Sequence, residues 1–166
     1  AIKPGGWYEG YLQHKEKAPH LGITTHADAE TIIKFLESGL FETVTFPLNV
    51  INTNRLPVVK YCQEKNITVI AMNPMGGGLL AANKRLKELA LRYLMAFDNV
   101  HPIIGFAAVE EVEYAKWIED TTKDCQQTPD EIQAEVRGLI DTQETLCTSC
   151  GYCQPCPQSI NIGVCL

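Results

Sequence analysis

The chain has 166 residues, 45% of them hydrophobic and 20% charged, which suits one globular domain with or without a small appendage. Its net charge of −6 and the lack of a basic stripe argue against a nucleic-acid partner. We see no secretory signal and no apolar run that could span a membrane, and the seven cysteines are an odd number, so we expect a protein of the reducing cytoplasm without a membrane partner.

Four short runs rich in Val, Ile and Thr alternate with helical segments along residues 1–120. Asp28 is the expected N-cap of the first helix, Gly39 ends that helix, and Pro57 falls in the first turn of the second. This alternation indicates βα units and a parallel sheet, hence an α/β fold with four such units. The expected strands are 21–25, 43–46, 67–71 and 102–104, and the expected helices are 28–36, 54–65, 84–95 and 109–119.

A fifth helix is expected in the second part of the chain, 121–166. Thr128, Pro129 and Glu131 have the spacing of a capping box with proline at the first helical position. This helix leads directly into a cysteine-rich ribbon, so we expect it to pack the ribbon onto the rest of the protein. Its apolar face is expected at Ile132, Val136, Leu139 and Ile140.

The ribbon carries Cys147, Cys150, Cys153 and Cys156 at three-residue intervals, followed by Pro157. Thiolates select iron–sulfur clusters, zinc or copper(I). Structural zinc sites usually take two ligand pairs from separate chain segments, whereas the nearest motif is the bacterial ferredoxin run. We predict a [4Fe-4S] cluster, with zinc and disulfides as the alternatives. The remaining cysteines are interpreted as structural: Cys62, Cys125 and Cys165.

Five segments in order resemble successive strand ends and neighbouring elements of the aldo/keto reductases, and the ribbon with the residues after it resembles the extension of the iron–sulfur branch of that family. The five segments are 22–26, 46–49, 71–78, 89–93 and 103–105. The resemblance implies a TIM-type (β/α)8 barrel, which needs about 250 residues. This chain supplies what resemble the last four units, a half-barrel over 1–120, followed by a helix and a ferredoxin-like ribbon over 121–166.

The resemblance also implies that the catalytic Asp, Tyr, Lys and His belong to the missing first half, so no catalytic residue is assigned here. That half is expected from the same polypeptide or another chain, or the half-barrel pairs with a second copy of itself. Four parallel strands would otherwise leave an unpaired edge.

The family's nicotinamide contacts are only partly matched. Thr24 and Thr25 stand where a polar pair holds the nicotinamide amide, and Thr45 replaces a glutamine. Where the family carries an Arg for the 2′-phosphate, then a Gln and an Asn, this chain has neutral or acidic residues, which disfavours NADPH on electrostatic grounds. NAD(P) stays a candidate cofactor. The replacing residues are Ala107, Glu111 and Ala115, and the expected cofactor contacts are Thr24, Thr25, Asn49 and Gly105.

Several further residues have two readings. His26, Asn49 and Asn73 follow strands, where barrel sites are built, so each is either a site residue or a structural one. The glycines 76–78 lack the spacing of a phosphate loop and indicate a tight turn or a close approach to a ligand.

Two functions fit the sequence. The first is an oxidoreductase acting on a small carbonyl-type substrate once the barrel is complete, with the cluster passing electrons or stabilising the C-terminal segment. The alternative is a non-catalytic accessory module that presents the cluster to a partner protein for electron transfer.

Overall fold

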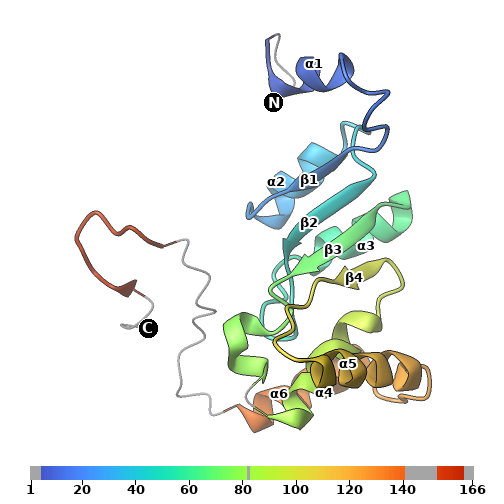
Figure 1. Ribbon diagram of the computed structural model, residues 1–166, viewed down its shortest axis with the longest axis vertical. Coiled ribbons are helices and arrows are strands. Elements are labelled where there is room, and N and C mark those ends of the chain that lie inside the picture. Colours follow the sequence, from blue (N-terminus) through green and yellow to red (C-terminus); the bar gives the residue numbers. More distant parts are fainter. Residues whose placement is uncertain (1–4, 82, 141–152, 163–166) are drawn as a thin grey trace.

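The computed structural model describes residues 5–81, 83–140 and 153–162. Their four strands form one parallel sheet with the order β1-β2-β3-β4, and each strand is followed by a helix (Figure 1). The expected α/β arrangement of four βα units is therefore confirmed. The elements are α1 (Trp7–Leu12), β1 (Gly22–Thr24), α2 (Ala29–Leu36), β2 (Thr43–Pro47), α3 (Leu56–Lys65), β3 (Thr68–Met72), the 3-10 segment η1 (Gly76–Ala81), α4 (Lys84–Met95), β4 (Val100–Pro102), α5 (Val109–Thr122) and α6 (Pro129–Leu139).

The sheet buries one face and leaves the other partly open. In β2 and β3 every second residue is fully buried, as alternation along a strand requires, and these residues join the core under the helices. The intervening residues are only half-buried. Strand register places Thr24 beside Thr45, Thr45 beside Ile70, and Ile70 beside His101. These four side chains therefore form one row across the open face.

Local signals set most helix boundaries. The Asp28 carboxylate accepts from the Thr31 amide at 2.9 Å, and the Asn83 side chain accepts from the Leu86 amide at 2.9 Å. Thr128 and Glu131 form the expected capping box of α6. Such caps satisfy amides that the first helical turn leaves without partners.

Most strand and helix bounds lie within two residues of those expected, and the differences at β4 and at the end of α5 have clear physical reasons. Strand β4 begins at Val100 rather than Pro102, because Val100 pairs with Val69 and is buried. The sequence does not indicate this start, because His101 and Pro102 interrupt the apolar run after Val100. Helix α5 continues to Thr122 rather than residue 119. The hydroxyl of Thr122 donates to the carbonyl of Ile118 at 2.6 Å, so the polar residues at this end remain inside the helix.

Helix α6 lies against α4. Ile132 and Val136 are buried as expected, whereas Leu139 is 47% exposed and does not belong to the buried face. The expectation that α6 packs the cysteine ribbon onto the body involves Cys147 and Cys150, which lie outside the described residues. Among the described helices, none is long and apolar enough to cross a membrane.

Candidate cofactor-binding edge of the sheet

The carboxyl ends of the four strands meet at one edge, together with the loops that follow them. At this edge Thr24 and Thr45 are register partners, and the Thr25 amide donates to the Thr45 carbonyl at 2.9 Å. The Thr25 hydroxyl accepts from the Ala27 amide at 3.1 Å and is thus used in the turn. Thr24 and Thr45 share the open face of the sheet, and the cofactor contacts expected at Thr24 and Thr25 stay predictions.

Asn49 is 0% exposed, and both ends of its amide are engaged within the chain. Its Oδ1 accepts from the amides of Ile51 and Asn52 at 3.1 and 2.8 Å, and its Nδ2 donates to the Asn73 carbonyl at 2.9 Å. Asn49 therefore ties the loop after β2 to the end of β3. The Asn49 side chain thus has a structural role here, and the cofactor contact expected at this residue stays a prediction.

The glycine loop after β3 is a tight turn. Gly76, Gly77 and Gly78 have φ values of 57°, 67° and 105°, a region in which side chains are disfavoured. The Gly77 amide donates to Asn73 Oδ1 at 2.7 Å, while the amides of Gly76 and Gly78 donate to carbonyls of the same loop. These amides are used internally and do not form a phosphate cradle.

Gly105 borders two adjoining cavities. One opens along the glycine loop towards Ile103, and the other runs between α4 and α5. The second cavity is largely apolar, with one cation and one carboxylate at its rim. Its lining is Met75, Ala81, Lys87, Leu91, Ile104, Gly105, Phe106, Glu111, Tyr114 and Ala115.

Glu111 lies in the first turn of α5, and its carboxylate interacts with two partners. Its carboxylate accepts from the Ala107 amide at 2.9 Å and pairs with the Lys87 ammonium at 3.3 Å. The Ala107 bond, followed by Lys87, lowers the pKa of the Glu111 carboxyl, so it is ionised at neutral pH. A phosphate approaching this helix start would meet a carboxylate.

The side chain of Arg55, which was not identified from the sequence, fixes the loop after β1. Arg55 donates from Nε to the Ala27 carbonyl at 2.8 Å and from Nη2 to the His26 carbonyl at 2.7 Å. These bonds cross 28 and 29 residues of chain, so no local pattern could reveal them.

The structure describes two of the four predicted cluster ligands. Cys153 is exposed and Cys156 half-buried, and neither is in a disulfide. Cys147 and Cys150 lie outside the described residues, so the four-cysteine site stays a prediction. Within the described ranges, no group of three or more His, Cys, Asp or Glu side chains gathers to hold a metal. Cys62 is fully buried and packs in the core as a small hydrophobic residue, which agrees with its interpretation as a structural cysteine.

No protein-family model matches the sequence, and no curated protein matches it. Among solved structures, the aldo-keto reductase from Bacillus halodurans is similar in its holo form, with 17% identity and a TM-score of 0.61 over 80% of this chain and 54% of that one. Its apo form gives 17% identity and 0.60 over 80% and 55%. A thermostable aldo-keto reductase in complex with the inhibitor epalrestat gives 15% and 0.55 over 79% and 52%.

The chain thus spans about half the length of the structures that it matches. At these identities the likeness shows the fold alone. The four-stranded parallel sheet is consistent with a partial barrel of the kind that these aldo-keto reductases have, which agrees with the fold that the resemblance in the sequence implied.

Proposed function

We propose that the chain supplies half of an aldo-keto reductase-type oxidoreductase that acts on a small carbonyl-type substrate once the rest of the barrel is present. The observation that carries this proposal is the open face of the sheet, where Thr24 and Thr45 lie side by side next to the strands' carboxyl ends. In barrels of this type, catalytic and binding residues come from that end. The catalytic groups themselves would come from the other half.

The partner is the missing barrel half, from the same polypeptide, another chain or a second copy. Within the described residues both outer strands have one free edge. Exposed apolar side chains lie near each edge: Trp7 and Phe35 line a pocket together with β1, and Ile103 directly follows β4, with exposures from 40% to 56%. Free edges with apolar borders favour burial by further structure.

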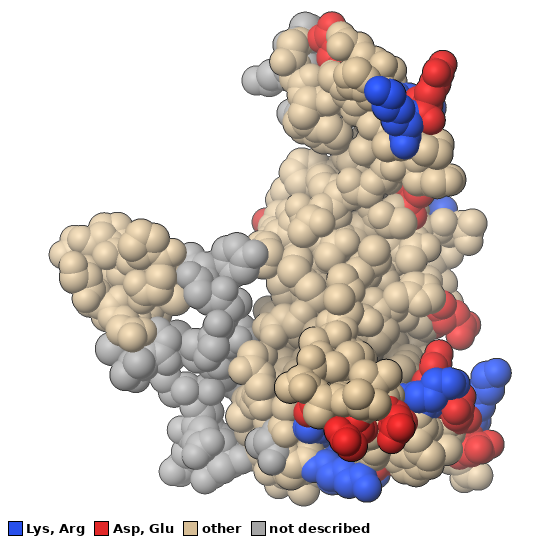
Figure 2. All heavy atoms as spheres, in the orientation of Figure 1, with Lys and Arg blue, Asp and Glu red and all other residues tan. Residues whose placement is uncertain are grey.

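The charge distribution fits the same partner. Figure 2 shows few charged side chains over the strands, whereas acidic and basic groups gather over α4 and α5. A face to be enclosed by another half-barrel must be largely uncharged, because burying unpaired charge is costly. The helix surfaces stay in water and can carry charge.

Nicotinamide is the cofactor that the edge would hold. In this proposal the Thr24 and Thr45 hydroxyls, from neighbouring positions on the open face, would hydrogen-bond its carboxamide, and the Gly105 loop would border the rest of the dinucleotide. The Glu111 carboxylate disfavours a 2′-phosphate, so NAD is favoured over NADP. When bound, nicotinamide supplies or accepts hydride; this chain's part is to orient it.

The cysteine ribbon is the proposed [4Fe-4S] site, with Cys147, Cys150, Cys153 and Cys156 as ligands. The thiols of Cys153 and Cys156 take part in no disulfide, which leaves them available as ligands. The cluster would pass electrons or stabilise the C-terminal segment, and the protein would work in the reducing cytoplasm.

The alternative is an accessory electron-transfer module without turnover of its own. The observation that favours it is the Glu111 carboxylate at the start of α5, which already occupies the Ala107 amide and would repel a phosphate at that place. Co-purification with a protein that supplies the other barrel half would favour the enzyme. Reduction of the cluster by a partner in a chain that binds no nicotinamide would favour the module.

The direct test is anaerobic purification of the 166-residue chain with metal analysis and visible spectroscopy. We expect about four irons per chain and a brown protein that bleaches on reduction. Cys156→Ala should lower the iron content, while Cys125→Ala, outside the ribbon, should not. Colourless protein with one bound zinc would overturn the cluster, and NADPH-dependent carbonyl reduction by the isolated chain would overturn the half-enzyme proposal.

A further inference from the structure

We infer that Arg55, Asn49 and Gln133 are positioning residues of one brace, which makes the docking of α6 and the conformation of the loop 24–28 a single cooperative unit. The brace joins the loops after β1, β2 and β3 to the helix that precedes the cysteine ribbon. The statement that the loop 24–28 contacts a nicotinamide rests on the proposed function. The statement that the brace sets the conformation of this loop does not depend on the proposed function.

The first link is Arg55, which lies just before α3. Its two bonds go to consecutive carbonyls, those of His26 and Ala27, so they fix the orientation of the peptide between them as well as its position. A guanidinium can do this because its donors form a rigid planar fork. Burial lowers the pKa of Arg55, which marks a site that is partly closed to water.

The second link is Asn49, at the start of the loop that contains Arg55. Its Oδ1 holds the amides of Ile51 and Asn52, while its Nδ2 holds the Asn73 carbonyl of the next strand end. Asn49 and Asn52 also form a backbone bridge. The loop 49–55 is therefore tied at one end to β3 and at the other, through Arg55, to the loop after β1.

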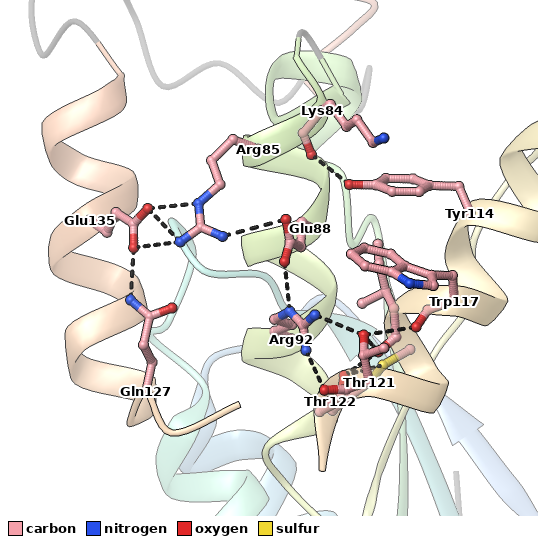
Figure 3. Close-up of polar contacts among 12 residues, drawn as sticks. Lys84, Arg85, Glu88, Arg92, Tyr114, Trp117, Thr121, Thr122, Gln127 and Glu135 are labelled. Carbon is pink, nitrogen blue, oxygen red and sulfur yellow. Dashed lines mark hydrogen bonds and ion pairs between the residues drawn. The ribbon is translucent and has the colours of Figure 1, made fainter. Parts of the chain in front are cut away.

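The third link comes from α6. Gln133 Nε2 donates to the Val50 carbonyl at 3.0 Å, across 83 residues of sequence. The helix is fixed against α4 independently: Glu135 accepts from Arg85 at 2.8 Å and from Gln127 at 2.7 Å (Figure 3). With α6 anchored in this way, Gln133 restrains Val50, which lies next to Asn49 at the opposite end of the loop from Arg55.

The consequence is a defined route of coupling. Loss of the Gln133 bond should loosen the loop 49–55, and through Arg55 the effect should reach the loop 24–28, although Gln133 has no bond to that loop among the described residues. Energetic coupling of this kind is established by non-additive double mutants rather than by proximity.

The test is hydrogen exchange with mass spectrometry on the full 166-residue chain. Arg55→Ala should speed exchange in peptides covering 24–28 by about tenfold, the loss expected for a charge-assisted hydrogen bond. Arg55→Lys, which keeps the charge without the fork, should restore this protection only in part. Gln133→Glu, which keeps the shape and removes the donor, should speed exchange at 49–55 and at 24–28. The matched controls are Lys60→Ala on α3 and Arg137→Gln on α6, both exposed.

The exchange of β2 and β3 amides must stay unchanged in each variant, which separates local loosening from global destabilisation. The combination of Arg55→Ala with Gln133→Glu should be less than additive at 24–28. Additive effects, or a Gln133→Glu effect confined to α6, would overturn the brace. A titration with NADH separates the two proposals. If the exchange rates change as expected but NADH does not bind, the brace stands and the proposed cofactor is wrong. If NADH binds but the exchange rates do not change as expected, only the brace is wrong.

Discussion

The replacement Asn49→Leu separates a structural asparagine from a ligand-binding one. The change keeps approximate volume and removes all three side-chain hydrogen bonds at a position that is 0% exposed. The Ile51 amide loses its side-chain acceptor, which costs about 1–3 kcal/mol for a buried group. The Asn52 amide keeps a bond to the Asn49 carbonyl and the Asn73 carbonyl keeps one from Gly76, so each loss is smaller.

Allowing for the added apolar burial, we expect a loss of about 2–4 kcal/mol in the free energy of unfolding. The midpoint of thermal unfolding should fall by roughly 5–15 °C for a chain of this size. Urea unfolding followed by circular dichroism measures the first quantity, and calorimetry measures the second. Asn54→Leu is the matched control, because Asn54 is exposed in the same loop. A loss below about 0.5 kcal/mol, the usual range of surface substitutions, would refute the structural reading.

Two further predictions concern buried groups. Desolvation raises the pKa of the Cys62 thiol to about 12, so little thiolate is present at pH 8. Iodoacetamide should therefore modify the exposed Cys153 in the folded apoprotein and leave Cys62 unmodified. Rapid labelling of Cys62 without unfolding would contradict this prediction. Arg92→Met should cost about 2–4 kcal/mol in urea unfolding, because the buried guanidinium bonds Glu88 at 3.0 Å and both the carbonyl and hydroxyl of Thr121 (Figure 3). The exposed Lys116→Met should cost under about 1 kcal/mol, and equal losses for the two changes would show that the burial of Arg92 adds nothing.

The parts of the fold that the sequence predicted are those set by local chemistry. Helix α4 has its expected bounds because Asn83 caps it and apolar residues repeat at helical spacing behind that cap. The capping box of α6 is equally local. Strand β4 was misplaced because its pairing with β3, rather than its own residues, defines where it begins.

The edge of the sheet that carries the candidate residues could be expected from the sequence, because parallel strands end at one edge, but the residues that support this edge could not. Thr24 was expected as a cofactor contact from a resemblance and Thr45 as a departure from it, and strand register places the two side by side. Arg55 and Gln133 were missed because a polar residue near a helix gives no sign of a carbonyl that lies far away in the sequence. Asn49 shows the opposite case. Its place after a strand suggested a ligand contact, whereas its side-chain amide is buried and hydrogen-bonded within the chain.

The strand order has a consequence for how such a chain is made. Because spatial order follows chain order, each strand can pair with the one synthesised just before it, and no strand must be inserted between two that are already paired. The sheet can therefore grow in one direction as the polypeptide leaves the ribosome. The same geometry lets units be joined end to end by gene fusion without disturbing the register of those already present.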